Sequence, residues 1–167
     1  MLYWVFDLDY TLYNLSKKEL FDYNKLKEDV EVTNYLRKFP LYKCIFTNGT
    51  HGHAVKSLQR LNMNNIFHHI EARDTLNGLK PDITIYQKFM EECGITNKDT
   101  VVFFEDTITN LKIAKTLGWS TVLITGYESA EFYNSKFKEK FPYVDFMFPD
   151  IKNALSYFYN KLELHSL

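Results

Sequence analysis

The chain has 167 residues, of which 46% are hydrophobic and 25% are charged, and its formal net charge is −1. This length suffices for one domain with a sizeable core, and the composition is that of a globular protein rather than of a disordered or fibrous one. The near-neutral charge and the lack of a long basic run exclude the electrostatic footprint of a nucleic-acid-binding protein. We therefore expect no nucleic-acid partner.

The sequence carries no signal for a membrane or for an oxidising compartment. The apolar residues 1–6 run directly into Asp7, so this stretch is too short for a signal peptide, and it lacks a basic region. No apolar run reaches the length of a transmembrane helix. The two cysteines, Cys44 and Cys93, are far apart in the chain. We expect a cytoplasmic, reduced environment and no membrane partner.

Strand-like and helix-like segments alternate along the chain, which predicts βαβ units and a parallel sheet. In chain order we expect strands over residues 2–8, 41–47, 67–72, 100–104, 120–125 and 144–148. The expected helices cover residues 14–39, notably 25–38, then 53–62, a segment that Pro81 opens and Gly94 ends, 111–117, 128–141 and 151–162. These elements predict an α/β fold with three layers, Rossmann-like, around a mainly parallel central sheet. Residues 1–167 are expected to form a single domain.

Four polar clusters lie at the ends of predicted strands or just before a helix. They are Asp7-Leu8-Asp9-Tyr10-Thr11, Thr47-Asn48-Gly49, Lys80-Pro81 and Glu105-Asp106. In open parallel sheets, ligands bind outside the carboxyl ends of the strands. We therefore expect these four clusters to converge on one place, although they are far apart in sequence.

The carboxylates of this set predict metal and phosphoryl chemistry. At strand spacing Asp7 and Asp9 point to the same side, where they repel each other unless a cation or a proton intervenes. Mg²⁺ prefers carboxylate ligands, and Asp106 can supply a further one, with Glu105 as a helper. One carboxylate can attack phosphorus while a second carboxyl protonates the leaving oxygen and later deprotonates water.

The remaining clusters supply groups that suit a phosphate. The Thr47 hydroxyl and the backbone N–H groups around Asn48 and Gly49 can hold phosphate oxygens, since glycine permits close approach. Lys80 adds a positive charge near the start of a helix, where the helix dipole also favours anions. Taken alone, each cluster is as well explained by ordinary turn or capping chemistry.

All four clusters in this order resemble the motifs of the haloacid dehalogenase superfamily of aspartate-nucleophile phosphatases, over residues 5–118. The resemblance implies that Asp7 is the nucleophile and a Mg²⁺ ligand. It implies that Asp9 is the acid/base and offers the metal its backbone carbonyl. The other implied roles are phosphate binding by Thr47, Asn48, Gly49 and Lys80, metal binding by Asp106, and support by Glu105, Asn110 and Thr11.

The amino-acid sequences of these motifs are most similar to those of the pyrimidine 5′-nucleotidase branch of that superfamily. The similar segments are residues 6–13, 46–54, 80–94 and 103–118. This resemblance implies a small phosphorylated substrate, with nucleotide 5′-phosphates as the first class to test. In that branch a helical cap precedes the second motif, whereas only residues 12–40 are present here, including a helix that returns to the second strand. We therefore expect a minimal cap and an open site.

The open site leaves alternatives. A macromolecular phosphatase, acting on a phosphoprotein or a nucleic-acid end, is one, and a non-catalytic binding module on the same fold is another. His51 and His53 lie near the phosphate loop but lack further zinc ligands at suitable spacing, so we expect His53 to support the loop and consider His51 for substrate contact. The run Tyr157-Phe158-Tyr159 is expected to pack into the core, and any exposed remainder is a candidate homodimer contact.

Overall fold

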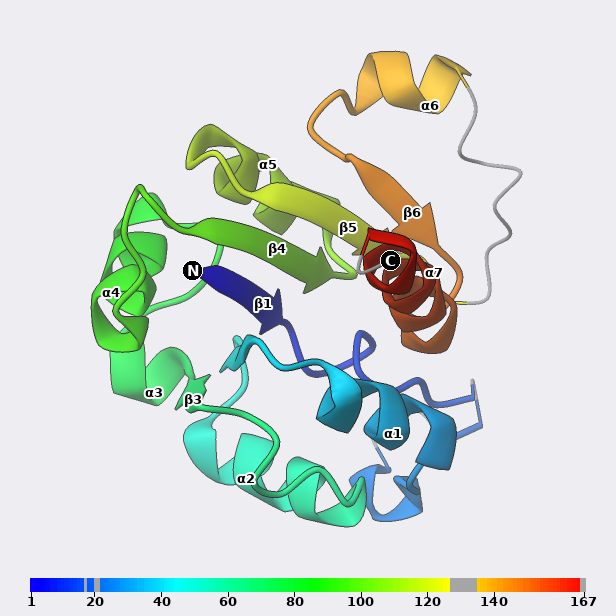
Figure 1. The fold of residues 1–167 in the computed structure, drawn as a ribbon. Coiled ribbons are helices and arrows are strands. Elements are labelled where there is room, and N and C mark those ends of the chain that lie inside the picture. The colour runs from blue at the N-terminus through cyan, green and yellow to red at the C-terminus, as the bar shows by residue number, and fades with distance from the viewer. Residues whose placement is uncertain (17, 20–21, 127–134, 166–167) are drawn as a thin grey trace.

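Six parallel strands form one sheet at the centre of the computed structural model, which describes residues 1–16, 18–19, 22–126 and 135–165 (Figure 1). The strands are β1 (Leu2–Phe6), β2 (Tyr42–Phe46), β3 (His69–Glu71), β4 (Thr100–Glu105), β5 (Ser120–Ile124) and β6 (Phe146–Phe148). Their order across the sheet is β3-β2-β1-β4-β5-β6, and every neighbouring pair is parallel. The strand order therefore reverses between β1 and β4, which is where ligands bind in such sheets.

Helices cover both faces of the sheet, which confirms the three-layer α/β fold expected from the sequence. The helices α1 (Val30–Lys38), α2 (His51–Arg60) and α7 (Ile151–His165) contribute to one hydrophobic cluster. The helices α3 (Arg73–Leu76), α4 (Ile83–Cys93), α5 (Ile108–Thr116) and α6 (Ser135–Lys140) pack with the other. None of the helices in the described residues is both long enough and apolar enough to cross a membrane.

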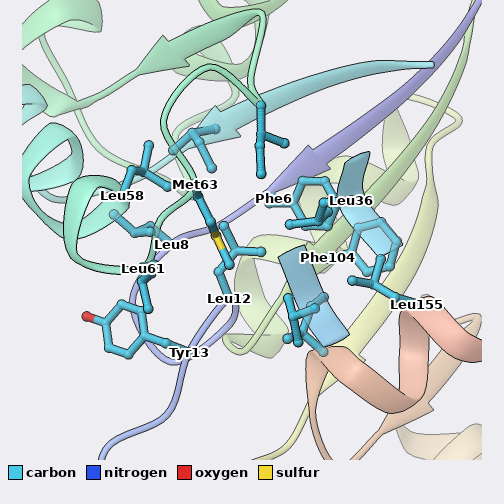
Figure 2. Packing of buried hydrophobic residues seen from close by; sticks show 14 of the residues in the cluster. Phe6, Leu8, Leu12, Tyr13, Leu36, Leu58, Leu61, Met63, Phe104 and Leu155 are labelled. Carbon is cyan, nitrogen blue, oxygen red and sulfur yellow. The ribbon is translucent and has the colours of Figure 1, made fainter. Parts of the chain in front are cut away.

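Strand β1 is buried on both faces because its side chains alternate between the two clusters. Trp4 and Phe6 belong to the first cluster, whereas Tyr3 and Val5 belong to the second. A continuous apolar run is typical of a strand covered by helices on both sides. Figure 2 shows Phe6 close to Phe104 of the neighbouring strand β4, and their rings stack at 4.6 Å between centroids. This packing fixes the end of β1, from which the first polar cluster begins.

The helix expected over residues 25–38 begins later, at Val30. The Asp29 side chain accepts hydrogen bonds from the backbone N–H groups of Glu31 and Val32, and it therefore caps the helix at that point. Residues 23–25 form a short 3₁₀ helix, η1 (Tyr23–Lys25), instead. The prediction extended too far because this polar stretch contains no residue that forbids a helix.

Helix α4 begins at Ile83 rather than at Pro81. Asp82 is its N-cap and accepts a hydrogen bond from the Thr84 backbone N–H. Its end is as expected, because Gly94 adopts φ +69°, a left-handed conformation that suits glycine. The short helix α3 was missed, since four residues carry no readable periodicity.

The remaining helices agree with the expectations to within a few residues. Helix α2 starts two residues before the expected 53–62, and α5 starts three residues before the expected 111–117. Of the helix expected over 128–141, residues 135–140 form α6, and residues 128–134 lie outside the described residues. Within the aromatic run on α7, Phe158 packs on Trp4 and Tyr159 packs on Phe39, as core packing requires. The homodimer contact stays a prediction.

The segment before α1 packs into the body of the protein. Leu12, Tyr13, Leu15 and Leu26 are buried in the first cluster, and Figure 2 shows Leu12 and Tyr13 near Leu61. Among the described residues of the stretch between Leu12 and Asp29, the only helix is the three-residue η1. This stretch therefore contributes side chains to the core.

Candidate active site

The ends of β1 and β4 bring three carboxylates together at the point where the strand order reverses. Asp7 directly follows β1, and its backbone N–H donates to the Phe104 carbonyl of β4 at 2.9 Å. Glu105 ends β4, and Asp106 follows it. One oxygen from each of Asp7, Glu105 and Asp106 lies within 4.8 Å of the others. The first and fourth polar clusters therefore converge as the sequence predicts.

Lys80 lies among these carboxylates, with only 1% of its side chain exposed. Its Nζ is 3.1 Å from Asp7 Oδ1 and 2.8 Å from Glu105 Oε2, and it donates to the Phe46 carbonyl at 2.6 Å. These three contacts use all three protons of the ammonium group. The structure thus places the predicted phosphate-binding lysine beside Asp7, the predicted nucleophile, where a phosphate oxygen would have to share or replace one of the three contacts.

Both oxygens of Glu105 are occupied by donors from the chain. Oε1 accepts hydrogen bonds from the backbone N–H groups of Asp106 and Thr107, at 3.0 and 3.1 Å. Oε2 accepts from Lys80 and from Asn110 Nδ2, the latter at 3.1 Å. Glu105 therefore orients Lys80 and the loop after β4, and Asn110 holds Glu105. The supporting roles expected for these two residues stay predictions.

Thr11 connects the two carboxylates that are predicted to hold a metal. Its Oγ1 is 3.2 Å from Asp7 Oδ2 and 3.4 Å from Asp106 Oδ1. The residue is buried, and its backbone N–H closes a turn to the Leu8 carbonyl. Thr11 therefore fixes the loop after β1 against the loop after β4.

The charges at the site are unbalanced without a further cation. Burial, and next the charge of Glu105, raise the pKa of Asp7 to about 7, although Lys80 acts against this. Burial, and next the hydrogen bond with Glu105, raise the pKa of Asp106 to about 9. Burial alone would also raise the pKa of Glu105, but Lys80 and the hydrogen bonds outweigh it and lower that pKa. A divalent cation beside Asp7 and Asp106 would relieve the repulsion, and an oxygen-only ligand set suits Mg²⁺.

The second polar cluster forms a tight loop beside Lys80. Thr47 Oγ1 accepts a hydrogen bond from the Gly49 backbone N–H at 3.0 Å. The Asn48 side chain accepts from the Lys80 backbone N–H at 2.8 Å and donates to the Lys80 carbonyl at 3.1 Å. The Asn48 amide thus joins the second and third clusters, and the chain itself uses this predicted phosphate-binding side chain. The donors left for a phosphate are the Thr47 hydroxyl and the Asn48 backbone N–H, which bonds to no other described residue.

Gly49 is the position in this loop where a side chain would be crowded by its neighbours. A Cβ atom there would lie 3.1 Å from His53 Cδ2 and 3.3 Å from Thr47 Oγ1, closer than ordinary contact. The glycine therefore allows the loop to approach α2 and the end of β2.

Asp9 lies apart from the three converging carboxylates and has its own partners. Its Oδ1 accepts a hydrogen bond from the Tyr13 hydroxyl and lies 2.7 Å from His53 Nε2. Burial, and next the hydrogen bond to Asp9, raise the pKa of Tyr13, so this hydroxyl stays protonated and donates. His53 was expected to support the loop, and the structure places it directly on Asp9. No role was expected for Tyr13, whose only sequence signal is its closeness to the first motif. The His51 backbone N–H donates to Asp74 Oδ1 at 2.8 Å, at the start of α2.

A cavity of about 380 Å³ lies beside the loop of the first cluster. Its walls include Tyr10 and Thr11 of that loop, the starts of α1 and α7, and Ile124 at the end of β5. They include neither Asp7 nor Asp9. The cavity still adjoins the carboxylates of the site through Thr11 and Tyr13, which line it and contact Asp7 and Asp9 respectively.

Solved structures with similar folds belong to several hydrolases and related enzymes. An L-2-haloacid dehalogenase from Xanthobacter autotrophicus is 17% identical, with 86% of this chain and 67% of that chain covered and a TM-score of 0.59. A haloacid dehalogenase-like hydrolase from Streptococcus pneumoniae is 12% identical, with coverage of 93% and 97% and a TM-score of 0.61. A candidate β-phosphoglucomutase from Thermotoga maritima is 14% identical, with coverage of 96% and 99% and a TM-score of 0.66. These identities show the shared fold alone.

A protein-family model assigns the chain to a family, beyond the shared fold. The model described as haloacid dehalogenase-like hydrolase matches residues 17–124, which is more than half of the chain. The matched range includes the second, third and fourth polar clusters, with Thr47, Lys80 and Asp106. The chain therefore belongs to the haloacid dehalogenase-like hydrolase family.

Proposed function

We propose that this hydrolase is a magnesium-dependent phosphatase that cleaves phosphomonoesters through an aspartyl-phosphate on Asp7. The observation that carries the proposal is the placement of Asp7 at the carboxyl end of β1, in contact with Lys80 and close to Asp106. A buried carboxylate next to a fixed cation is suited to attack an electrophile whose negative charge the same cation offsets.

The reaction would proceed in two displacements. In the first, an oxygen of Asp7 forms a bond to phosphorus, the bond to the leaving oxygen breaks, and Asp9 gives its proton to that oxygen. In the second, water attacks phosphorus, Asp9 takes a proton from the water, and the bond to Asp7 breaks. Inorganic phosphate leaves, and both aspartates return to their starting states. Asp9 is available for this acid/base role because it is not one of the three clustered carboxylates Asp7, Glu105 and Asp106.

Asp7 and Asp106 are the residues that would hold Mg²⁺, and the resemblance adds the backbone carbonyl of Asp9. The bound ion would offset the charges of the nucleophile and of the phosphate. Thr11 touches both carboxylates and would keep them together. The Thr47 hydroxyl, the backbone around Asn48 and Gly49, and Lys80 would bind the phosphate oxygens.

The proposed substrate has a small leaving group. The similarity of the motifs to those of pyrimidine 5′-nucleotidases favours nucleotide 5′-phosphates as the substrate class. We further propose a single domain over residues 1–167 in which residues 12–40 serve as a minimal cap. A second candidate follows from this segment. Because Leu12, Tyr13, Leu15 and Leu26 pack into the core, little chain remains to cover the site. A macromolecular phosphoester at an open site is therefore the alternative substrate class.

The activity test is hydrolysis of 4-nitrophenyl phosphate with Mg²⁺ and with a chelator. We expect turnover that requires the metal and that falls to background in Asp7→Asn, because the variant lacks the nucleophile. Asp82→Asn is a matched control, since Asp82 caps α4 and asparagine caps helices as well. Absence of activity with the metal would favour the non-catalytic binding module. Full activity in Asp7→Asn would rule out the proposed nucleophile.

The substrate class is tested on a panel of nucleotide 5′-phosphates, sugar phosphates, phosphopeptides and 5′-phosphorylated oligonucleotides. We expect the highest kcat/KM on a small phosphomonoester. A strong preference for a phosphopeptide or an oligonucleotide would instead support the macromolecular alternative.

A further inference from the structure

The two oxygens of the Asp9 carboxylate have different surroundings. Oδ1 lies against the Tyr13 hydroxyl and His53 Nε2, as described above. Oδ2 faces the phosphate loop, because a Cβ atom built on Gly49 would lie 3.5 Å from it. One oxygen is therefore engaged by two side chains, and the other is directed toward the loop where the phosphate is expected.

The two partners of Oδ1 are themselves held in place. Tyr13 is buried in the first hydrophobic cluster, next to Leu61 in Figure 2. His53 lies in the first turn of α2, where its backbone N–H donates to Thr50 Oγ1, the N-cap of the helix, at 3.2 Å. The ring of Tyr23 meets the imidazole edge-on at 4.4 Å between centroids. A core residue and a capped helix therefore fix the position of Oδ1.

We propose that Tyr13 and His53 are positioning residues that hold Asp9 by Oδ1, so that Oδ2 alone exchanges protons with the substrate. This proposal rests on the proposed phosphatase function. The Tyr13 hydroxyl donates to Oδ1 and His53 Nε2 lies against the same oxygen, so Oδ2 is the oxygen that faces the phosphate loop and the substrate. As the bond from phosphorus to the leaving oxygen breaks, the proton moves from Oδ2 to that oxygen. In the second displacement Oδ2 accepts the proton that the attacking water loses.

The proposal differs in a measurable way from a purely structural role for the same residues. A basic leaving group, such as an alkoxide, needs a proton as its bond breaks, whereas 4-nitrophenolate leaves without one. A misplaced Asp9 therefore slows alkyl phosphates much more than 4-nitrophenyl phosphate. Loss of folded protein or of phosphate binding would slow both classes equally.

The experiment measures kcat/KM, which reports the first displacement, for a series of aryl and alkyl phosphates. In Tyr13→Phe and in His53→Ala we expect a loss of about 10- to 100-fold on alkyl phosphates and of about threefold or less on 4-nitrophenyl phosphate, since general acid catalysis supplies about 10²- to 10⁴-fold. His53→Gln should recover part of the loss, because its side-chain amide can donate to Oδ1. Tyr42→Phe is the matched control, since Tyr42 is 41% exposed and lies at the start of β2, away from the strand ends that carry the site.

The ratio of the two rates does not depend on the fraction of active protein, so partial misfolding of a variant does not affect the comparison. Equal losses on every leaving group, or no loss in either variant, would overturn the positioning role and leave the phosphatase proposal intact. A wild-type protein without phosphatase activity would overturn both proposals.

Discussion

At the scale of single side chains, Lys80 is a cation buried among the carboxylates of the site. Its ammonium group is buried between Asp7 and Glu105, within 3.1 Å of both. Burial alone would lower the pKa of Lys80, but the two carboxylates outweigh it and raise that pKa. The lysine therefore stays charged, and its removal would leave two buried carboxylates without a counter-charge.

Lys80→Met is accordingly expected to lower the free energy of unfolding by about 3 kcal/mol, the order seen when one partner of a buried ion pair is removed. Urea denaturation at neutral pH measures the change. Lys98→Met is the control, because Lys98 is an exposed lysine in the loop before β4. A loss in Lys80→Met no larger than in the control would show that the buried pair contributes nothing net.

The raised pKa of Asp106 predicts how stability depends on pH without metal. The folded-state pKa of about 9 is far above the value near 3.9 of an unfolded aspartate, so the folded state binds more protons between these values. Stability from this group is therefore present at low pH and is lost as pH rises toward about 9. Thermal melting of the wild type and of Asp106→Asn measures it.

In that comparison, Asp106→Asn should gain stability relative to the metal-free wild type as pH rises. Mg²⁺ should remove the difference, because the ion binds the deprotonated carboxylate of the wild type and stabilises the folded state. A difference that is constant with pH, or that Mg²⁺ leaves unchanged, would contradict a strained carboxylate cluster.

At the scale of the elements, Asp29 ties α1 to α7. It caps α1 through the Glu31 and Val32 N–H groups, and its carboxylate pairs with Lys152 of α7 at 2.9 Å. Asp29→Ala should lower the free energy of unfolding by about 1–2 kcal/mol because it removes the cap. Asp29→Asn keeps a capping side chain and loses only a partly exposed ion pair, so its cost should stay below about 1 kcal/mol. Urea denaturation compares the two, and equal losses would assign the effect to the ion pair.

Most elements were predictable from the sequence because buried parallel strands appear as continuous apolar runs. The run Val101 to Phe104 is an example, and it forms most of β4. The predicted helix boundaries were wrong where a single side chain determines the first residue of the helix. Asp29 and Asp82 stop their helices from starting earlier by capping them, although nothing in the local pattern distinguishes these aspartates from other acidic residues nearby.

The convergence of the four clusters was likewise predictable, since strand ends in a parallel sheet share one edge. The orientation of individual side chains was not. The Asn48 amide turns to the Lys80 backbone, and Asp9 meets His53, through contacts between segments far apart in the chain. Such contacts depend on the distance between folded segments, which residue spacing does not encode.

Across the whole molecule, two hydrophobic clusters lie on opposite faces of one sheet, and each contains one of the two tryptophans. Trp4 reports on the first cluster and Trp119 on the second. Alternate residues of β1 and β4 belong to the two clusters. Neither cluster can therefore unfold without disrupting the one sheet on which both pack. The protein should therefore unfold in one cooperative transition.

Two variants with one tryptophan each, Trp4→Phe and Trp119→Phe, test this cooperativity. In each variant the urea transition measured by tryptophan fluorescence should coincide with the transition measured by far-ultraviolet circular dichroism. Separate midpoints within one variant would show that the two faces of the sheet unfold independently.

The outermost strands, β3 and β6, have three residues each. An exposed strand edge is a template on which another chain can add a strand, and the hazard grows with the length of the unpaired ladder. Here the longer strands are all interior, so each margin of the sheet offers only a short row of free backbone groups. The open sheet can thus present the edge that carries the proposed site to solvent while its sides give little opportunity for aggregation between molecules.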